Sequence, residues 1–158
     1  MNFAIILLII VAIFFVSAFV TKRRFGVLGL ALCAGSMLSS IWSKEVTLFI
    51  EGAGVELMSP PLSVVVATTI VLLPAIFMLF RGPTYSKRWQ RLVGSMAFAL
   101  LAMTFLLTAF GNSLSLDENG MKVYSFLTSN KSIIITVGIV YALYDVITYK
   151  TPKKKDKE

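Results

Sequence analysis

The stretch "NFAIILLIIVAIFFVSAFVTKRRFG", residues 2–26, places a long uncharged run directly before three cations, Lys22, Arg23 and Arg24. A helix needs about 20 apolar residues to cross the hydrocarbon layer of a membrane. The run therefore predicts a spanning helix over 2–20. Because the cations follow the apolar core and do not precede it, the pattern favours a retained anchor over a cleavable signal peptide.

The composition extends this interpretation to the whole chain. Of the 158 residues, 57% are hydrophobic and 15% are charged, and the mean hydropathy is +0.84. Soluble domains contain about 45–50% apolar residues, and they need a polar surface that this chain cannot provide. The composition predicts a small polytopic membrane protein.

Four further apolar stretches are long enough to span a membrane. They cover residues 26–42, 62–80, 92–110 and 132–149. None alternates polar and apolar residues, so helices are favoured over barrel strands, and backbone groups in lipid must be paired internally. We therefore expect an all-α fold, a single bundle of five transmembrane helices within residues 1–149.

Two segments outside the predicted spans have their own character. Residues 43–58 mix glutamates with large apolar residues, which predicts a short amphipathic segment in the membrane interface. Residues 111–131, which contain "DENG", are expected to form a small exposed loop. Residues 150–158 are expected to form a basic cytoplasmic tail.

Lysine and arginine alternate strongly between the gaps. Three lie in 21–25, four in 81–91 and five in 150–158, against one in 43–61 and two in 111–131. The positive-inside rule then places the N-terminus outside and the C-terminus in the cytoplasm, in a multi-pass protein of the plasma (inner) membrane. The predicted topology and headgroup residues are Lys22, Arg23, Arg24, Lys87, Arg88, Arg91, Lys153, Lys154 and Lys155. Because the cations flank apolar segments, the expected partner is anionic lipid and not nucleic acid.

The residue types that carry most enzyme chemistry are scarce. The chain has no histidine, and its one cysteine, Cys33, lies in an apolar run without a neighbouring cation. We therefore predict no enzymatic activity, no metal site and no cofactor.

Small residues recur at helical spacing on two of the predicted spans. The predicted helix-packing residues are Ala31, Gly35, Ser39, Gly94, Ser95 and Ala99. Small side chains let helices approach closely in lipid. The faces could serve packing within one chain or a homo-oligomer, and both readings stay open.

Two residues inside the spans are candidates for transport chemistry. Asp145 is the acidic residue within a predicted span, and such residues suggest a proton or ion site. Alternatively, Asp145 is only five residues from Lys150 at the expected membrane boundary, so its side chain could simply reach the water of the headgroup region. Pro74 permits a kink that could be static or could act as a hinge.

Several motifs together resemble a known family. They are the turn Arg23-Arg24-Phe25-Gly26, the segment 43–58, the basic linker 81–91 and the helix entry Arg91-Leu92-Val93-Gly94. Over roughly residues 1–112 the chain resembles the colicin V production (CvpA-like) family of small bacterial inner-membrane proteins. The resemblance implies an envelope protein linked to secretion or membrane homeostasis, with no catalytic residues.

Two functional hypotheses follow. The first is a non-enzymatic accessory or scaffold protein of the bacterial envelope, which contacts itself or another membrane protein. The second is a small transporter or channel subunit that uses Asp145 and the Pro74 kink.

Overall fold

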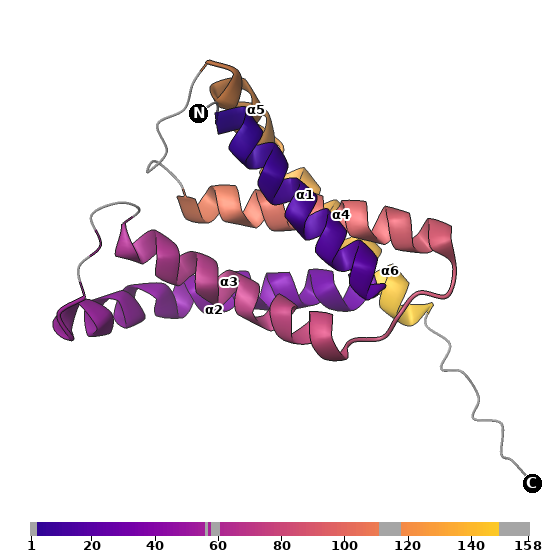
Figure 1. Ribbon diagram of the computed structural model, residues 1–158, viewed down its shortest axis with the longest axis horizontal. Coiled ribbons are helices and arrows are strands. Elements are labelled where there is room, and N and C mark those ends of the chain that lie inside the picture. Colours follow the sequence, from indigo (N-terminus) through magenta and orange to yellow (C-terminus); the bar gives the residue numbers. More distant parts are fainter. Residues whose placement is uncertain (1–2, 56, 58–60, 111–117, 149–158) are drawn as a thin grey trace, which may run out of the picture.

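The computed structural model describes residues 3–55, 57, 61–110 and 118–148, and the regular elements within them are all helices. The helices are α1 (Phe3–Thr21), α2 (Phe25–Gly52), α3 (Leu62–Arg81), α4 (Arg88–Phe110), α5 (Glu118–Ser129) and α6 (Lys131–Ile147). The predicted all-α class is confirmed for this part of the chain (Figure 1).

Three helices, α2, α3 and α4, are long and apolar enough to cross a membrane. α5 and α6 meet at a bend of 61°, and together they supply a fourth candidate span if the bent pair crosses as one unit. The part of α1 with described side chains, Leu8–Thr21, is apolar but shorter than a span. Three or four candidate spans are therefore present in the described residues, and five crossings remain a prediction.

Helix α2 is longer than the sequence pattern predicts. The expected span ended at residue 42, but the helix continues to Gly52 before the chain turns at Gly54, whose φ is +85°. No proline or glycine interrupts residues 43–51, so nothing in the backbone stops the helix earlier. At 1.5 Å per residue its 28 residues measure about 42 Å, more than the roughly 30 Å of hydrocarbon in a bilayer.

The second outer segment also differs from its prediction. The exposed loop expected over 111–131 is wrong for Glu118–Ser129, which form α5. Leu127 packs against Met103 and Leu107 of α4, and this burial supports a helix that the local sequence signals obscured. Asp117, the first residue of the "DENG" turn, lies outside the described residues.

The core lies around α2, which packs against α3, α4 and α6, while α1 crosses α4 (Figure 1). Phe25, Leu28 and Leu32 of α2 are at most 1% exposed, and they contact buried residues of the neighbouring helices. Gly35 allows the closest approach, because a Cβ there would lie 2.2 Å from the carbonyl oxygen of Val71. This glycine sets the separation between α2 and α3.

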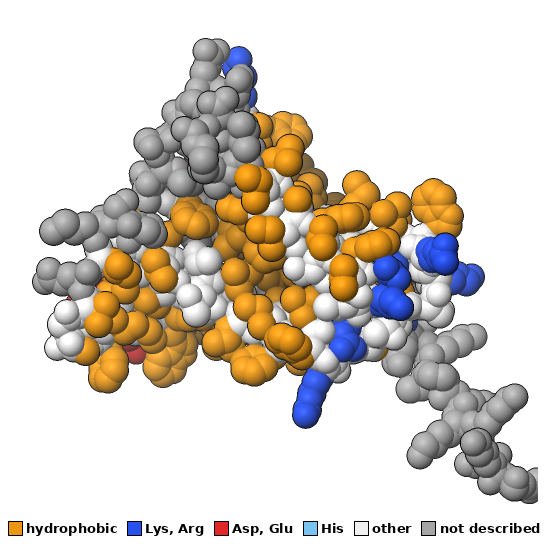
Figure 2. All heavy atoms as spheres, viewed as in Figure 1, with side chains coloured by type: hydrophobic (Ala, Val, Ile, Leu, Met, Phe, Trp, Pro, Cys, Tyr) orange, Lys and Arg blue, Asp and Glu red, His pale blue; other side chains and the backbone are white. Residues whose placement is uncertain are grey.

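The helices alternate in direction, so that several basic turns meet at one end of the bundle. Blue side chains gather there in Figure 2, where α3 ends and α4 begins. We call this the basic end, and its described cations are Lys22, Arg23, Arg24, Arg81, Lys87, Arg88 and Arg91. An up-and-down bundle places every second connection at the same end. Cations that are concentrated in alternate connections therefore gather at one end.

Candidate functional site

Two connections that are far apart in the sequence pair with each other at the basic end. The backbone N–H of Arg24 donates to the carbonyl oxygen of Pro83 at 3.0 Å, and that of Tyr85 donates to Lys22 at 2.8 Å. Arg23 and Thr84 form the antiparallel bridge between these bonds. The α1–α2 turn is thereby fastened to the α3–α4 connection.

Arg23 closes the C-terminal end of α3. Its Nε donates to the carbonyl oxygen of Leu79 at 2.7 Å, and its terminal nitrogens donate to Phe80 and Gly82. The last carbonyls of a helix lack partners within the helix and carry its negative dipole end. Arg23 therefore caps α3 from another connection, in addition to its predicted role in setting topology.

Arg24 and Asp145 form a buried ion pair between the start of α2 and the end of α6. Arg24 Nη2 lies 2.7 Å from Asp145 Oδ1, and the two side chains are 12% and 8% exposed. The other carboxylate oxygen, Oδ2, accepts the backbone N–H of Gly26 at 2.9 Å. Both oxygens of Asp145 are therefore engaged by groups at the N-terminus of α2.

Tyr85 completes this arrangement from the α3–α4 connection. Its hydroxyl oxygen accepts the backbone N–H of Phe25 at 3.1 Å, and the Arg24 guanidinium lies 5.2 Å from the centre of its ring. The first N–H groups of a helix have no internal acceptor. Asp145 and Tyr85 supply acceptors for two of them, while Arg24 at the N-cap supplies none. We call Arg24, Gly26, Tyr85 and Asp145 the Arg24–Asp145 centre.

The charge states in the centre follow from its contacts. Burial raises the pKa of the Tyr85 hydroxyl, and the negative charge of Asp145 raises it further, so the phenol stays neutral. Burial alone lowers the pKa of Arg24, but its hydrogen bond and charge interaction with Asp145 outweigh this effect and raise the pKa overall. The centre therefore holds a permanent cation beside a neutral tyrosine.

Two glycines make room for the centre. A Cβ at Gly26 would lie 2.7 Å from the carbonyl oxygen of Ala142, so the glycine lets α2 approach α6 closely. A Cβ at Gly94 would lie 2.7 Å from the ring of Tyr85. Gly94, in the second turn of α4, thus leaves the space that the tyrosine occupies.

The structure separates the predicted topology residues into two groups. Arg23 and Arg24 are engaged with other parts of the protein, as described above, while Lys22, Lys87 and Arg88 are exposed. Arg91 is half-buried, with its guanidinium carbon 4.0 Å from the centre of the Phe19 ring. The predicted tail residues Lys153, Lys154 and Lys155 lie outside the described residues.

The predicted helix-packing residues occupy two different contacts. On α2, Ala31 is half-buried, Gly35 meets the backbone of α3, and the Ser39 hydroxyl donates to the carbonyl oxygen of Ala67 at 3.2 Å. On α4, Gly94 faces Tyr85, the Ser95 hydroxyl donates to the carbonyl oxygen of Arg91 at 2.8 Å, and Ala99 is 2% exposed. Pro74 lies inside α3, which runs through it from Leu62 to Arg81.

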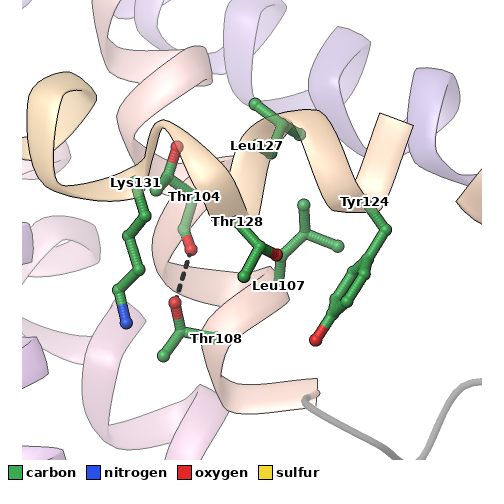
Figure 3. Close-up of a pocket in the computed structure, with 7 residues that line it drawn as sticks. All are labelled: Thr104, Leu107, Thr108, Tyr124, Leu127, Thr128 and Lys131. Atoms are coloured by element: carbon green, nitrogen blue, oxygen red, sulfur yellow. Dashed lines mark hydrogen bonds between the residues drawn. The ribbon is translucent and has the colours of Figure 1, made fainter. Parts of the chain in front are cut away.

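A small pocket lies near the C-terminal end of α4, where α5 bends into α6 (Figure 3). Its volume is about 120 Å³, and three threonines, Thr104, Thr108 and Thr128, line it together with Tyr124 and Lys131. Thr108 donates to the carbonyl oxygen of Thr104 at 2.9 Å. The pocket can hold a few water molecules. Within the described residues, no three His, Cys, Asp or Glu side chains come together as a metal site.

Sequence reasoning missed Tyr85, and it named Gly26 only within the turn motif of the family resemblance. It placed Asp145 near Lys150 and did not pair it with Arg24. A signal was present, since an acidic residue inside a membrane usually pairs with a cation. The sequence contains 15 lysines and arginines, however, and nothing in their positions indicates which one pairs with Asp145. The partner follows only from the packing of α2 against α6.

Comparison with known proteins finds no matching family, no similar curated protein and no similar solved structure. The class is therefore defined by the fold itself: the residues that the structure describes form an all-helical bundle with three or four candidate membrane spans. Its buried charges join connections and helix ends to one another. Function has to be argued from this geometry.

Proposed function

We propose that the protein is a non-enzymatic integral membrane scaffold, an accessory protein of the bacterial envelope. The observation that carries the proposal is that both oxygens of the Asp145 carboxylate bind groups of the protein, Oδ1 the Arg24 side chain and Oδ2 the backbone N–H of Gly26. A carboxylate that carries protons or ions has to release its protein partners during the transport cycle in order to bind them. Here the carboxylate holds the starts and ends of helices together, which is a structural task.

The outward surface of the bundle supports the same proposal. Large apolar side chains of α3 point away from the core, among them Phe77 and Phe80, which are 64% and 75% exposed. Such faces suit lipid or the helices of a membrane partner, including a second copy of this chain. In this proposal the chain crosses the membrane five times, with the N-terminus outside and the basic end in the cytoplasm.

The resemblance to the colicin V production family supplies the process in which such a scaffold would act. The resemblance implies a role in secretion or membrane homeostasis. It rests on the motifs around Arg23–Gly26 and Arg91–Gly94. The Arg23–Gly26 motif lies in the Arg24–Asp145 centre, and Gly94 of the second motif packs against Tyr85. The motif residues thus serve the fold, as expected for a protein that acts through its shape.

A flux assay separates the scaffold from a small transporter or channel. Purified protein is reconstituted into vesicles that contain a pH-sensitive dye, and proton and alkali-ion gradients are imposed. We expect dissipation no faster than in protein-free vesicles, for the wild type and for Asp145→Asn alike. A wild-type flux that Asp145→Asn abolishes, while the variant keeps its size profile in detergent, would replace the scaffold with a transporter that uses Asp145 and the Pro74 kink.

Crosslinking in cells tests the positive side of the proposal. A photoreactive side chain is placed at one exposed position on each of three helices: Phe77, Met96 or Val137. A scaffold is expected to give a protein adduct of defined mass from one face, which mass spectrometry identifies as an integral membrane protein. Lipid adducts alone at all three positions would argue against a scaffold.

A further inference from the structure

We propose that α1 and α4 form a binding site for one anionic phospholipid, with an acyl chain in the groove between them and the phosphate at Arg91. The inference rests on the membrane location in the proposed function and adds a ligand to it. It is argued from an apolar groove and from a cation held directly beyond one end of that groove.

The groove has purely apolar walls. Leu8, Val11 and Phe15 of α1 face Met96, Leu100 and Met103 of α4, around a volume of about 520 Å³. From Leu8 to Phe15 the groove follows α1 for roughly 10 Å, at 1.5 Å per residue. This length fits within one leaflet of a bilayer whose hydrocarbon layer is about 30 Å thick.

Aromatic rings connect the groove to the basic end. The ring of Phe15, in the groove wall, stacks on that of Phe19 at 5.8 Å with an angle of 13° between the rings. The guanidinium carbon of Arg91 lies 4.0 Å from the centre of the Phe19 ring. One helical turn beyond the groove, the protein therefore holds a cation in a fixed place.

Arg91 has binding capacity that the protein does not use. Among the described residues, its side chain forms no ion pair with a carboxylate, and its guanidinium contacts the ring of Phe19 instead. Arg88, one turn earlier on α4, is exposed and can add a second set of donors. Guanidinium groups bind phosphate through paired N–H donors, so this end of the groove is suited to a phosphate headgroup.

The charge at the end of the groove favours an anionic lipid over a protein helix. The groove has apolar walls, and Arg91 and Arg88 lie beyond one end of it. An apolar groove that ends at cations matches an anionic amphiphile, whose acyl chain and headgroup need these two surfaces side by side.

Native mass spectrometry of the detergent-solubilised chain tests the proposal with two lipids of identical acyl chains, phosphatidylglycerol and phosphatidylcholine. We expect the wild type to bind one phosphatidylglycerol at least tenfold more tightly than phosphatidylcholine. Arg91→Gln is expected to remove this preference. Arg81→Gln is the matched control, because it removes an exposed cation from the basic end on a different helix, and its preference should change less than twofold.

A second variant tests the groove itself. Leu100 is 51% exposed, so Leu100→Trp can fill the groove without entering the core. This variant is expected to weaken the binding of both lipids at least fivefold. Glycerol phosphate, which lacks acyl chains, should not compete with the lipid for the wild type at tenfold excess. Circular dichroism of each variant checks that the helix content is unchanged.

Three results would overturn the inference: equal binding of both lipids by the wild type, equal losses in Arg91→Gln and Arg81→Gln, or competition by glycerol phosphate. The last would indicate an anion site without an acyl chain. These outcomes leave the scaffold proposal intact, since that proposal fails separately if the flux assay detects transport through Asp145.

Discussion

At the scale of single residues, the ion pair of Arg24 and Asp145 is the interaction on which the basic end depends. The pair is largely removed from water, and its carboxylate also caps α2 through Gly26. Burying two charges is costly, so the pair itself adds little net stability. Removing one partner is different, because it leaves the other charge buried without compensation.

Asp145→Asn is therefore expected to destabilise the fold by about 3 kcal/mol, within the range for a broken buried pair. The double variant Arg24→Gln/Asp145→Asn should recover most of this loss, since it buries no uncompensated charge. Thermal unfolding in detergent measures both, with Arg81→Gln as an exposed control that should leave the midpoint unchanged. A double variant no more stable than Asp145→Asn would show that the pair is not the source of the loss.

At the scale of elements, glycine decides how closely the helices pack. Lipid gives helices no hydrophobic drive toward each other, so their association depends on close contact and on hydrogen bonds between them. α2 meets α3 at Gly35 and α6 at Gly26, and in both places a methyl group would collide with the backbone of the neighbouring helix. Backbone cannot move aside as a side chain can, so a larger residue at either position has to push the two helices apart.

Gly35→Ala is expected to cost on the order of 2 kcal/mol, because its Cβ would lie 2.2 Å from the oxygen of Val71 and force α3 outward. Gly52→Ala is the matched control: no atom lies within 4 Å of its Cβ, so the change should be neutral or slightly stabilising. Thermal unfolding and size-exclusion profiles in detergent compare the two. Equal midpoints for both variants would contradict the close α2–α3 contact.

At the scale of the whole molecule, cations gather at the end where α1, α3 and α6 finish (Figure 1, Figure 2). Positive charge is retained in the cytoplasm during membrane insertion. The tertiary structure brings the turns 22–24 and 82–87 into direct contact, so the proposed membrane topology has to place both turns on the same side. Orientation can therefore be tested at a single exposed position on each end.

Single cysteines at Ser86 and Ala53, in a Cys33→Ala background, test this orientation. Both positions are exposed and lie at opposite ends of the bundle. In intact cells a membrane-impermeant maleimide is expected to label Ala53→Cys but to label Ser86→Cys only after the membrane is opened. External labelling of Ser86→Cys would reverse the proposed topology and remove the basis for a cytoplasmic basic end.

Much of the architecture was predictable, because apolar length and the placement of cations are local properties of the chain. They define the all-helical class, the spans that became α2, α3 and α4, and the alternation that brings the basic turns together. They did not predict the extension of α2 to Gly52 or the existence of α5. In both segments polar and apolar residues are mixed, so their sequence resembles that of a loop. Only the packing shows that they are helical.

The sequence by itself determined that Asp145 lies near one end of an apolar helix and that Arg24 opens another. Only the tertiary structure decided that these two residues, 121 positions apart, form a pair, and that Tyr85 and Gly26 complete the centre. The physical reason is that a helix constrains neighbours three or four residues away, while an ion pair depends on the distance between helices. That distance is set by glycine contacts between helix backbones. The spacing of small residues indicated Gly35 as a packing position, but only the tertiary structure shows which helix each glycine meets.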